Sequence, residues 1–275
     1  MPDYLTSDFS PLTSKNMEIL NSKIFGENLT ATPLLVFHGL FGMLDNWGSF
    51  GKDLGEYLPV HLIDLRNHGR SFHSDSMSHD DLADDIARYM DHYGIQKAHV
   101  LGHSLGGKAV MQFAIKYPER VEKLIVVDIS PKAYPPHHQG IIKALETVDF
   151  NMVTSRNEVE AVLNQYIPER STVQFLTKNL YWDDNKKLGW RFNLKTLSEK
   201  YNEFVSNAVK FGVFEGDTLF IAGAKSNYIL PQDEYGIKQQ FPKAKIVTVK
   251  NAGHWVQAEN PVDFANVVKE FLGLN

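Results

Sequence analysis

Short apolar runs alternate along this chain with stretches whose apolar residues recur every three to four positions. This alternation of strand and helix patterns is typical of an α/β fold, in which helices wrap a parallel sheet. Several runs are apolar at every position, as expected for central strands buried on both faces. The predicted strands cover residues 34–37, 60–65, 98–101, 124–127, 219–222 and 246–249, and residues 17–25 are expected to add an antiparallel strand.

Two helices carry clear start and stop signals. Ser78, followed three residues later by Asp81, precedes a helical pattern that ends at Gly94, which predicts a capping box and a glycine stop. Near the end of the chain, Pro261 occupies a first-turn position and Gly273 follows the last apolar position of the pattern. Both helices are expected to belong to the scaffold.

The alternation stops for a long stretch after the strand pattern at residues 124–127. This stretch opens with three prolines, which predict a stiff, hinge-like segment, and its interior spacing is mainly helical. We therefore expect an α/β core formed by residues 1–130 and 217–275, with a helical cap inserted at residues 131–216.

Composition narrows the class of protein. The 275 residues, 43% hydrophobic and 22% charged, suit one large globular domain or a domain with an insertion. The net charge is −5 and basic residues form no stripe, so nucleic acid is not expected as a partner. The absence of cysteine excludes disulfides, thiolate metal sites and a cysteine nucleophile. No metal-ligand spacing or cofactor motif is recognised, so we expect neither a metal nor a cofactor.

The N-terminal residues lack the features of a targeting segment. Residues 1–16 are polar and rich in serine and threonine, without a basic start or an apolar core. No stretch approaches 18 consecutive apolar residues, so no membrane span is expected. A cytoplasmic location is the expectation, and nothing in the sequence marks a subunit interface.

A Gly-x-Ser-x-Gly motif lies between a predicted strand and a predicted helix. Residues 102–107 read Gly-His-Ser-Leu-Gly-Gly, and this context predicts a nucleophile elbow. The glycines are required because the turn is strained and its flanks pack so closely that a Cβ atom would clash. Ser104 is therefore the predicted nucleophile.

A serine hydroxyl needs a base, and the base needs an acid that orients it. Among eleven histidines, His254 lies where this architecture expects the base, in the loop after the last predicted strand. Asp128 ends an apolar strand and is our predicted acid, since strand ends gather at the ligand-binding edge of open α/β sheets. Asp233 is the alternative, because Ser226 and Asn227, in the loop after the strand at 219–222, carry no charge.

The oxyanion formed on ester attack needs backbone N–H donors. Leu105, at a helix N-terminus directly after the nucleophile, is expected to supply one. The second is expected from the loop at residues 38–42, where Leu40 is our choice and Phe41 the alternative. His38 in the same loop is expected to support the turn rather than to transfer protons.

Four motifs in order along nearly the whole chain resemble those of the α/β-hydrolase superfamily. They are His38-Gly39 with Gly42, Asp64-x-Arg66-x-His68-Gly69-x-Ser71, residues 102–107 and the histidine loop 251–255. Within the superfamily the chain is similar to the YbfF-like esterase branch, related to abhydrolase-domain-eleven proteins. This second resemblance is carried by residues 38–42, Asp45-Asn-Trp47, Gly-Gly-Lys-Ala-Val-Met111, Val-Asp-Ile-Ser-Pro131 and Trp190-Arg-Phe-Asn193. That branch places its acid where Asp128 stands.

The resemblance implies a serine carboxylesterase that acts on small-molecule acyl esters, with thioesters as a further class, under a helical cap. Ser104, His254 and Asp128 are the expected triad of an acyl-enzyme mechanism. An acyltransferase using the same acyl-enzyme and a catalytically silent ligand-binding homologue are the alternatives. Aromatic residues predict an apolar substrate pocket, for which we select Phe41, Trp182 and Trp255.

Overall fold

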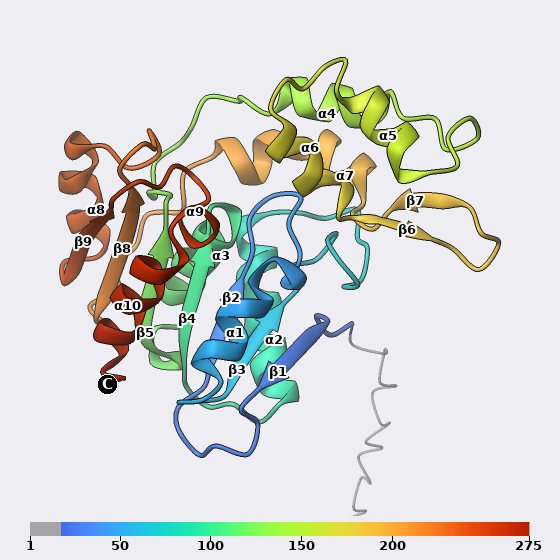
Figure 1. Cartoon of the computed structure of the whole chain (residues 1–275). Helices are drawn as coiled ribbons and strands as arrows, with labels where there is room; N and C mark the ends of the chain where they lie inside the picture. The colour runs from blue at the N-terminus through green and yellow to red at the C-terminus, as the bar shows by residue number, and fades with distance from the viewer. Residues whose placement is uncertain (1–17, 275) are drawn as a thin grey trace, which may run out of the picture.

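A seven-stranded sheet runs through the part of the chain that the computed structural model describes, residues 18–274 (Figure 1). All neighbouring strands are parallel except β1, which pairs antiparallel with β3. In spatial order the strands are β1 (Ser22–Phe25), β3 (Val60–Ile63), β2 (Leu34–Phe37), β4 (Ala98–His103), β5 (Val121–Val127), β8 (Thr218–Gly223) and β9 (Ala244–Val249).

This sheet confirms the predicted fold class and the strand predictions. Five of the six predicted apolar runs lie within a strand, and β2 has the predicted bounds, whereas the run at residues 60–65 extends two residues beyond β3. The predicted N-terminal strand is shorter than expected, since β1 covers only residues 22–25. Residue 17, with which that prediction began, lies outside the described residues.

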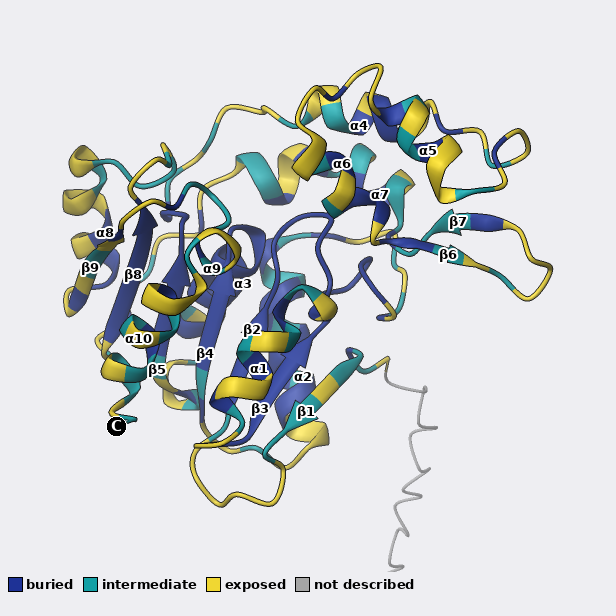
Figure 2. Ribbon diagram, viewed as in Figure 1, coloured by how far each residue is buried: buried dark blue, intermediate teal, exposed yellow. Residues whose placement is uncertain are grey.

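Helices cover both faces of the sheet, because successive residues of a strand point to opposite sides. Leu34 and Val36 of β2 pack in one cluster with residues of α1 (Gly48–Leu54) and α10 (Pro261–Leu272). Leu35 and Phe37 pack in a second cluster with residues of α2 (His79–His92), α3 (Leu105–Lys116) and α8 (Glu234–Gln240). Figure 2 shows the central strands buried between these two layers.

The helix signals are confirmed with one correction. Ser78 Oγ accepts a hydrogen bond from the N–H of Asp81, and Gly94 and Gly273 follow the helix ends with φ of 65° and 79°. The capping box is not completed as predicted: Asp81 Oδ2 accepts from the hydroxyls of Ser76 and Ser78 instead of from the Ser78 N–H. The aspartate side chain is one methylene shorter than that of the glutamate typical of this position.

The segment between β5 and β8 lies over the carboxyl ends of the strands (Figure 1). It is mainly helical, as its spacing predicts, but it also contains an antiparallel hairpin that the spacing did not indicate. Its elements are α4 (Gln139–Glu146), α5 (Arg156–Leu163), α6 (Arg170–Thr177), β6 (Leu180–Trp182), β7 (Leu188–Trp190), α7 (Leu194–Glu199) and a short π-helix at Asn202–Ser206. No helix within residues 18–274 is long and apolar enough to cross a membrane.

Candidate active site

Ser104 lies in a strained turn between β4 and α3. Its φ of 52° and ψ of −115° belong to a region that L-residues rarely adopt, and such strain often marks functional positions. A Cβ atom on Gly102 would lie 2.1 Å from the carbonyl oxygen of Gly106, and one on Gly106 would lie 2.5 Å from that of Phe37. The close packing that the motif predicts at both glycines is therefore present.

Asp128 follows β5 directly, and its carboxylate is fully buried against His254. His254 Nδ1 lies 2.7 Å from Asp128 Oδ2. The second carboxylate oxygen accepts from the N–H of Gly223 at 3.0 Å, and Oδ2 also accepts from the hydroxyl of Ser226. Because a carboxylate only accepts, Nδ1 of His254 carries the proton, and Nε2 of the neutral imidazole is left as a proton acceptor.

Asp233, the alternative acid, is engaged elsewhere. Its Oδ2 accepts from Lys132 Nζ at 2.6 Å and from the N–H of Leu230 at 2.8 Å. The structure thus brings Asp128, and not Asp233, to the histidine.

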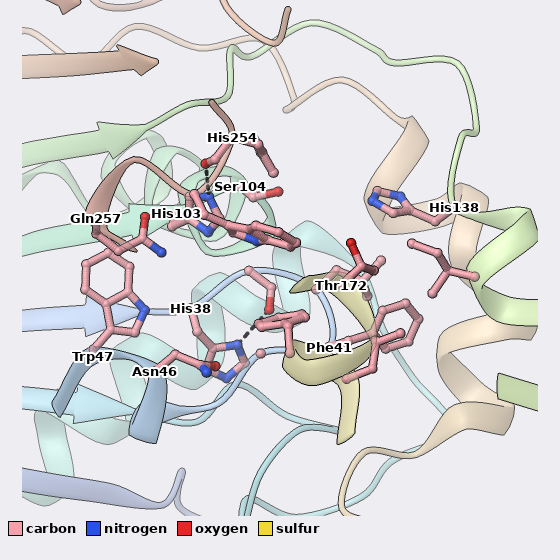
Figure 3. Close-up of a pocket in the computed structure, with 17 residues that line it drawn as sticks. His38, Phe41, Asn46, Trp47, His103, Ser104, His138, Thr172, His254 and Gln257 are labelled. Atoms are coloured by element: carbon pink, nitrogen blue, oxygen red, sulfur yellow. Dashed lines mark hydrogen bonds between the residues drawn. The ribbon is translucent and has the colours of Figure 1, made fainter. Parts of the chain in front are cut away.

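Ser104 and His254 line one pocket, which holds about 570 Å³ of space (Figure 3). Its walls come from the loop at residues 38–42, from the histidine loop and from α4 and α6. Phe41 packs on Phe192 and Trp255 packs on Phe175, with ring centroids 5.1 and 5.4 Å apart. Phe41 and Trp255 both line this pocket.

Trp182 does not reach this pocket. It ends β6 in the hairpin that projects away from the sheet (Figure 1), and it is 55% exposed. Its selection as a pocket residue rested on aromatic content of the segment, which does not specify the direction in which a hairpin extends.

A second, smaller pocket of about 310 Å³ meets the first at Ser104. The two share Leu40, Ser104 and His138. The remaining lining residues of the second pocket are Leu105, Lys108, Ile129, Tyr134, His137, Val205 and Tyr228. Ser104 therefore lies between two spaces, which suits an ester whose two sides extend in different directions from its carbonyl carbon.

Two backbone segments that could supply oxyanion donors lie beside Ser104. Leu105 begins α3, so its N–H has no acceptor within the helix. The loop at 38–42 passes close by, since a Cβ atom on Gly39 would lie 3.2 Å from Ser104 Cβ. Leu40 lines both pockets, whereas Phe41 lines only the larger, with its carbonyl oxygen accepting from Asn179 Nδ2 at 2.8 Å.

His38 and Asp64 support this loop. His38 Nε2 accepts from the N–H of Leu65 at 3.0 Å, so its Nδ1 donates to the carbonyl oxygen of Gly39 at 2.8 Å. Burial lowers the pKa of His38 to about 4, which keeps the imidazole neutral. Asp64 accepts from the N–H of Leu44 at 2.7 Å. Both side chains hydrogen-bond the backbone, as expected for structural residues.

Several site residues were missed by sequence reasoning. Ser226 donates to Asp128, and the ring of Tyr228 stacks on that of His254 with centroids 3.9 Å apart. His103 Nε2 donates to the carbonyl oxygen of His254 at 2.8 Å, and burial holds its pKa well below the usual range. No local pattern marks these residues, since their partners are distant along the chain.

Lys108 was also missed, although it lies one turn after Ser104. Its ammonium donates to the carbonyl oxygens of Lys132 and Val205, each at 3.2 Å, and to that of Asn207. These carbonyls lie on both connections between the sheet and the inserted segment. Burial lowers the pKa of Lys108 to about 7.

Known proteins with similar sequences and structures share this architecture. Residues 32–166 match the alpha/beta hydrolase fold family. The chain is 36% identical to the sn-1-specific diacylglycerol lipase ABHD11 of Danio rerio, over 92% of this chain and 82% of that one. It is 34% identical to esterase YbfF of Escherichia coli, over 88% and 93%. A solved marine microorganism esterase superposes with a TM-score of 0.89 at 34% identity, covering 92% and 99% of the two chains. The resemblance stated from the sequence motifs is confirmed.

Proposed function

We propose that this chain, which belongs to the α/β-hydrolase family and hydrolyses carboxylic esters, does so through a covalent acyl-enzyme on Ser104. The observation that carries the proposal is the hydrogen bond of 2.7 Å between His254 Nδ1 and the buried carboxylate of Asp128, in a pocket that Ser104 also lines. This arrangement supports His254 as a base whose Nε2 is free to take a proton.

In the proposed first half-reaction, Ser104 Oγ attacks the carbonyl carbon of the ester while its proton passes to His254 Nε2. The negative charge that develops on the carbonyl oxygen is stabilised by the N–H groups of Leu105 and Leu40. Asp128 stabilises the imidazolium. The carbon–oxygen bond to the leaving group then breaks, and the departing alcohol takes the proton from His254.

In the second half-reaction, His254 removes a proton from water, which attacks the acyl carbon bound to Ser104. The bond to Ser104 Oγ breaks, the serine regains the proton from His254, and the carboxylic acid leaves. Each step balances without a further reactant.

We propose that residues 131–216 form a cap over a core made of residues 1–130 and 217–275. The contribution of the segment to the larger pocket supports this division, since Ile141 of α4 and Phe175 of α6 face the same space as Ser104. The cap excludes water from part of the site and supplies apolar lining.

The apolar lining supports substrates with apolar acyl groups. Phe41, Phe175 and Trp255 offer hydrophobic surface beside Ser104. We propose small-molecule acyl esters as the substrates, with acyl thioesters as a second class, because the same attack on the carbonyl carbon expels a thiolate.

A serine-directed fluorophosphonate tests the mechanism. It is expected to label the wild type and a Ser49→Ala variant, whose altered serine is exposed on α1 and outside both pockets at Ser104. Folded Ser104→Ala is expected to lose both labelling and hydrolysis of p-nitrophenyl esters. Absence of labelling in the folded wild type would overturn the proposal and favour a silent binding protein. Formation of ester rather than free acid as the main product, with added alcohols, would make the chain an acyltransferase.

A further inference from the structure

We infer that Tyr228 is a positioning residue for His254, and that His137, near the start of the proposed cap, holds Tyr228 in place. The inference rests on the base role proposed for His254. It assigns a function to the loop after β8, which carries no carboxylate before Asp233 and where we first considered only the acid of the triad.

The first observation is the stacking of two rings. The phenol ring of Tyr228 lies nearly parallel to the imidazole of His254, with an interplanar angle of 16° and centroids 3.9 Å apart. The face of an aromatic ring attracts a cation, so this stack favours the imidazolium that forms during each proton transfer. It also restricts rotation of the imidazole, whose Nδ1 is already held by Asp128.

The second observation is the hydrogen bond that fixes the phenol. His137 Nδ1 lies 2.9 Å from the carbonyl oxygen of Pro135, to which only a protonated nitrogen donates. His137 Nε2 is then the acceptor of the neutral ring, and it receives the hydroxyl of Tyr228. Burial raises the pKa of Tyr228, so the phenol keeps its proton and remains a donor. Pro135 and Pro136 restrict the backbone immediately before His137.

The backbone of Tyr228 is held from both sides as well. Its carbonyl oxygen accepts from the hydroxyl of Tyr134 at 2.6 Å, and the rings of the two tyrosines lie 5.4 Å apart. Its N–H donates to Ser226 Oγ at 3.2 Å, and that hydroxyl donates to Asp128. Asp128 and Tyr228 therefore hold two sides of one imidazole while being linked to each other through Ser226.

The consequence is a base oriented from two parts of the chain. Asp128 fixes His254 from the sheet, whereas Tyr228 fixes it through contacts with the segment at residues 134–137. Loosening of that segment leaves the pair of Asp128 and His254 intact but frees the ring to rotate about its Asp128 contact. The inference thus predicts a loss in turnover rather than in substrate binding.

Three single variants, and the double variant of Tyr228→Phe with His137→Ala, separate the role of the ring from that of its hydroxyl. Tyr228→Phe keeps the stack and removes the hydrogen bond, and it is expected to lower kcat about 2- to 10-fold. Tyr228→Leu removes both and is expected to lower kcat about 10- to 100-fold. His137→Ala should equal Tyr228→Phe, and the double variant should be no slower than either, because each removes the same bond. In Tyr228→Phe, which keeps the ring that lines the second pocket, KM is expected to stay within about 2-fold of wild type.

A pH profile gives a second readout. Among the described residues, the titratable groups that face His254 are Asp128, His103, His138 and Tyr228. Loss of the stack removes stabilisation of the imidazolium, so the acid limb of kcat/KM should move to lower pH in Tyr228→Leu and stay near its original position in Tyr228→Phe.

Tyr235→Leu is the matched control, since Tyr235 is 75% exposed on α8 and lines neither pocket at Ser104. The inference is overturned if Tyr228→Leu keeps kcat within 2-fold of wild type, if its defect lies in KM alone, or if Tyr235→Leu is equally slow. Folding of each variant is checked by circular dichroism, and Tyr228→Phe keeps the test decisive if Tyr228→Leu does not fold. Fluorophosphonate labelling of the wild type separates failure of this inference from failure of the proposed function, because only failure of the proposed function gives no labelling at all.

Discussion

Asp128→Asn removes one charge from the candidate site and almost no volume. The carboxylate accepts three hydrogen bonds, from the N–H of Gly223 at one oxygen and from Ser226 and His254 at the other. An amide offers only one oxygen. If that oxygen faces Gly223, the amide nitrogen faces His254 Nδ1, and the proton of the imidazole must move to Nε2. His254 then has no free nitrogen with which to take the proton of Ser104.

The size of the effect follows from the distance. With His254 Nδ1 and Asp128 Oδ2 2.7 Å apart, the two charges are centred roughly 4 Å apart. At an effective dielectric constant of about 20 their attraction is about 4 kcal/mol. Since about 1.4 kcal/mol is a factor of ten in rate, loss of the charge alone slows formation of the imidazolium about 10³-fold. The wrong tautomer adds to this, so we expect a fall in kcat of about 10³- to 10⁴-fold.

The assay is hydrolysis of p-nitrophenyl acetate at pH 7.5, with thermal melting to verify the fold. Asp233→Asn is the matched control, because Asp233 pairs with Lys132 and is expected to leave kcat within about 3-fold of wild type. The reasoning is refuted if folded Asp128→Asn keeps more than a tenth of wild-type kcat, or if both variants lose activity equally.

Three further predictions concern stability and are measured by urea denaturation. Gly102→Ala should lower the free energy of unfolding by at least about 3 kcal/mol, because its Cβ would lie 2.1 Å from a backbone carbonyl oxygen of α3. Gly48→Ala, with open space around it, should lower it by less than about 0.5 kcal/mol. Similar values for the two variants would contradict this reasoning. Burial lowers the pKa of His38 to about 4 and of His68 to about 3. The unfolded chain therefore binds more protons than the folded chain below pH 6.5. The free energy of unfolding present above pH 6.5 should fall by about 2 kcal/mol for each histidine by pH 5, and equal stability at pH 7.5 and pH 5 would disprove this prediction. Lys108→Met leaves its backbone carbonyl partners without a donor and should destabilise the fold by about 1–3 kcal/mol. An unchanged midpoint of urea denaturation would rule out this effect.

The strands were predictable because burial on both faces requires apolar residues at every position. β2 has the predicted bounds, but β5 begins at Val121, three residues earlier than predicted. Its early residues Glu122 and Lys123 lie near the surface, where polar side chains interrupt the apolar run. The hairpin of β6 and β7 was missed, since strands of three residues are too short to display a period of two.

The residues of the candidate site also fall into those that the sequence predicts and those that it does not. The turn around Ser104 follows from a local motif, and the position of Asp128 at the end of an apolar strand favours it over Asp233. Ser226 and Tyr228 carry no such signal, because their roles depend on contacts with residues about a hundred positions away or with the next loop. Trp182 illustrates the opposite error, in which residue type alone suggested a role that its position in the hairpin does not allow.

The ammonium of Lys108 links the two ends of the long segment inserted between β5 and β8. By joining residue 132 to residues 205 and 207, it ties together the two connections between the sheet and the inserted segment. The entropy of closing a loop grows only slowly with its length once the ends are fixed. Residues 139–201 are therefore the part of the chain that protein engineers could shorten, lengthen or exchange to remodel what lies above Ser104, provided that the contacts of Asn179 with Phe41 and of Asn193 with Asn67 are kept.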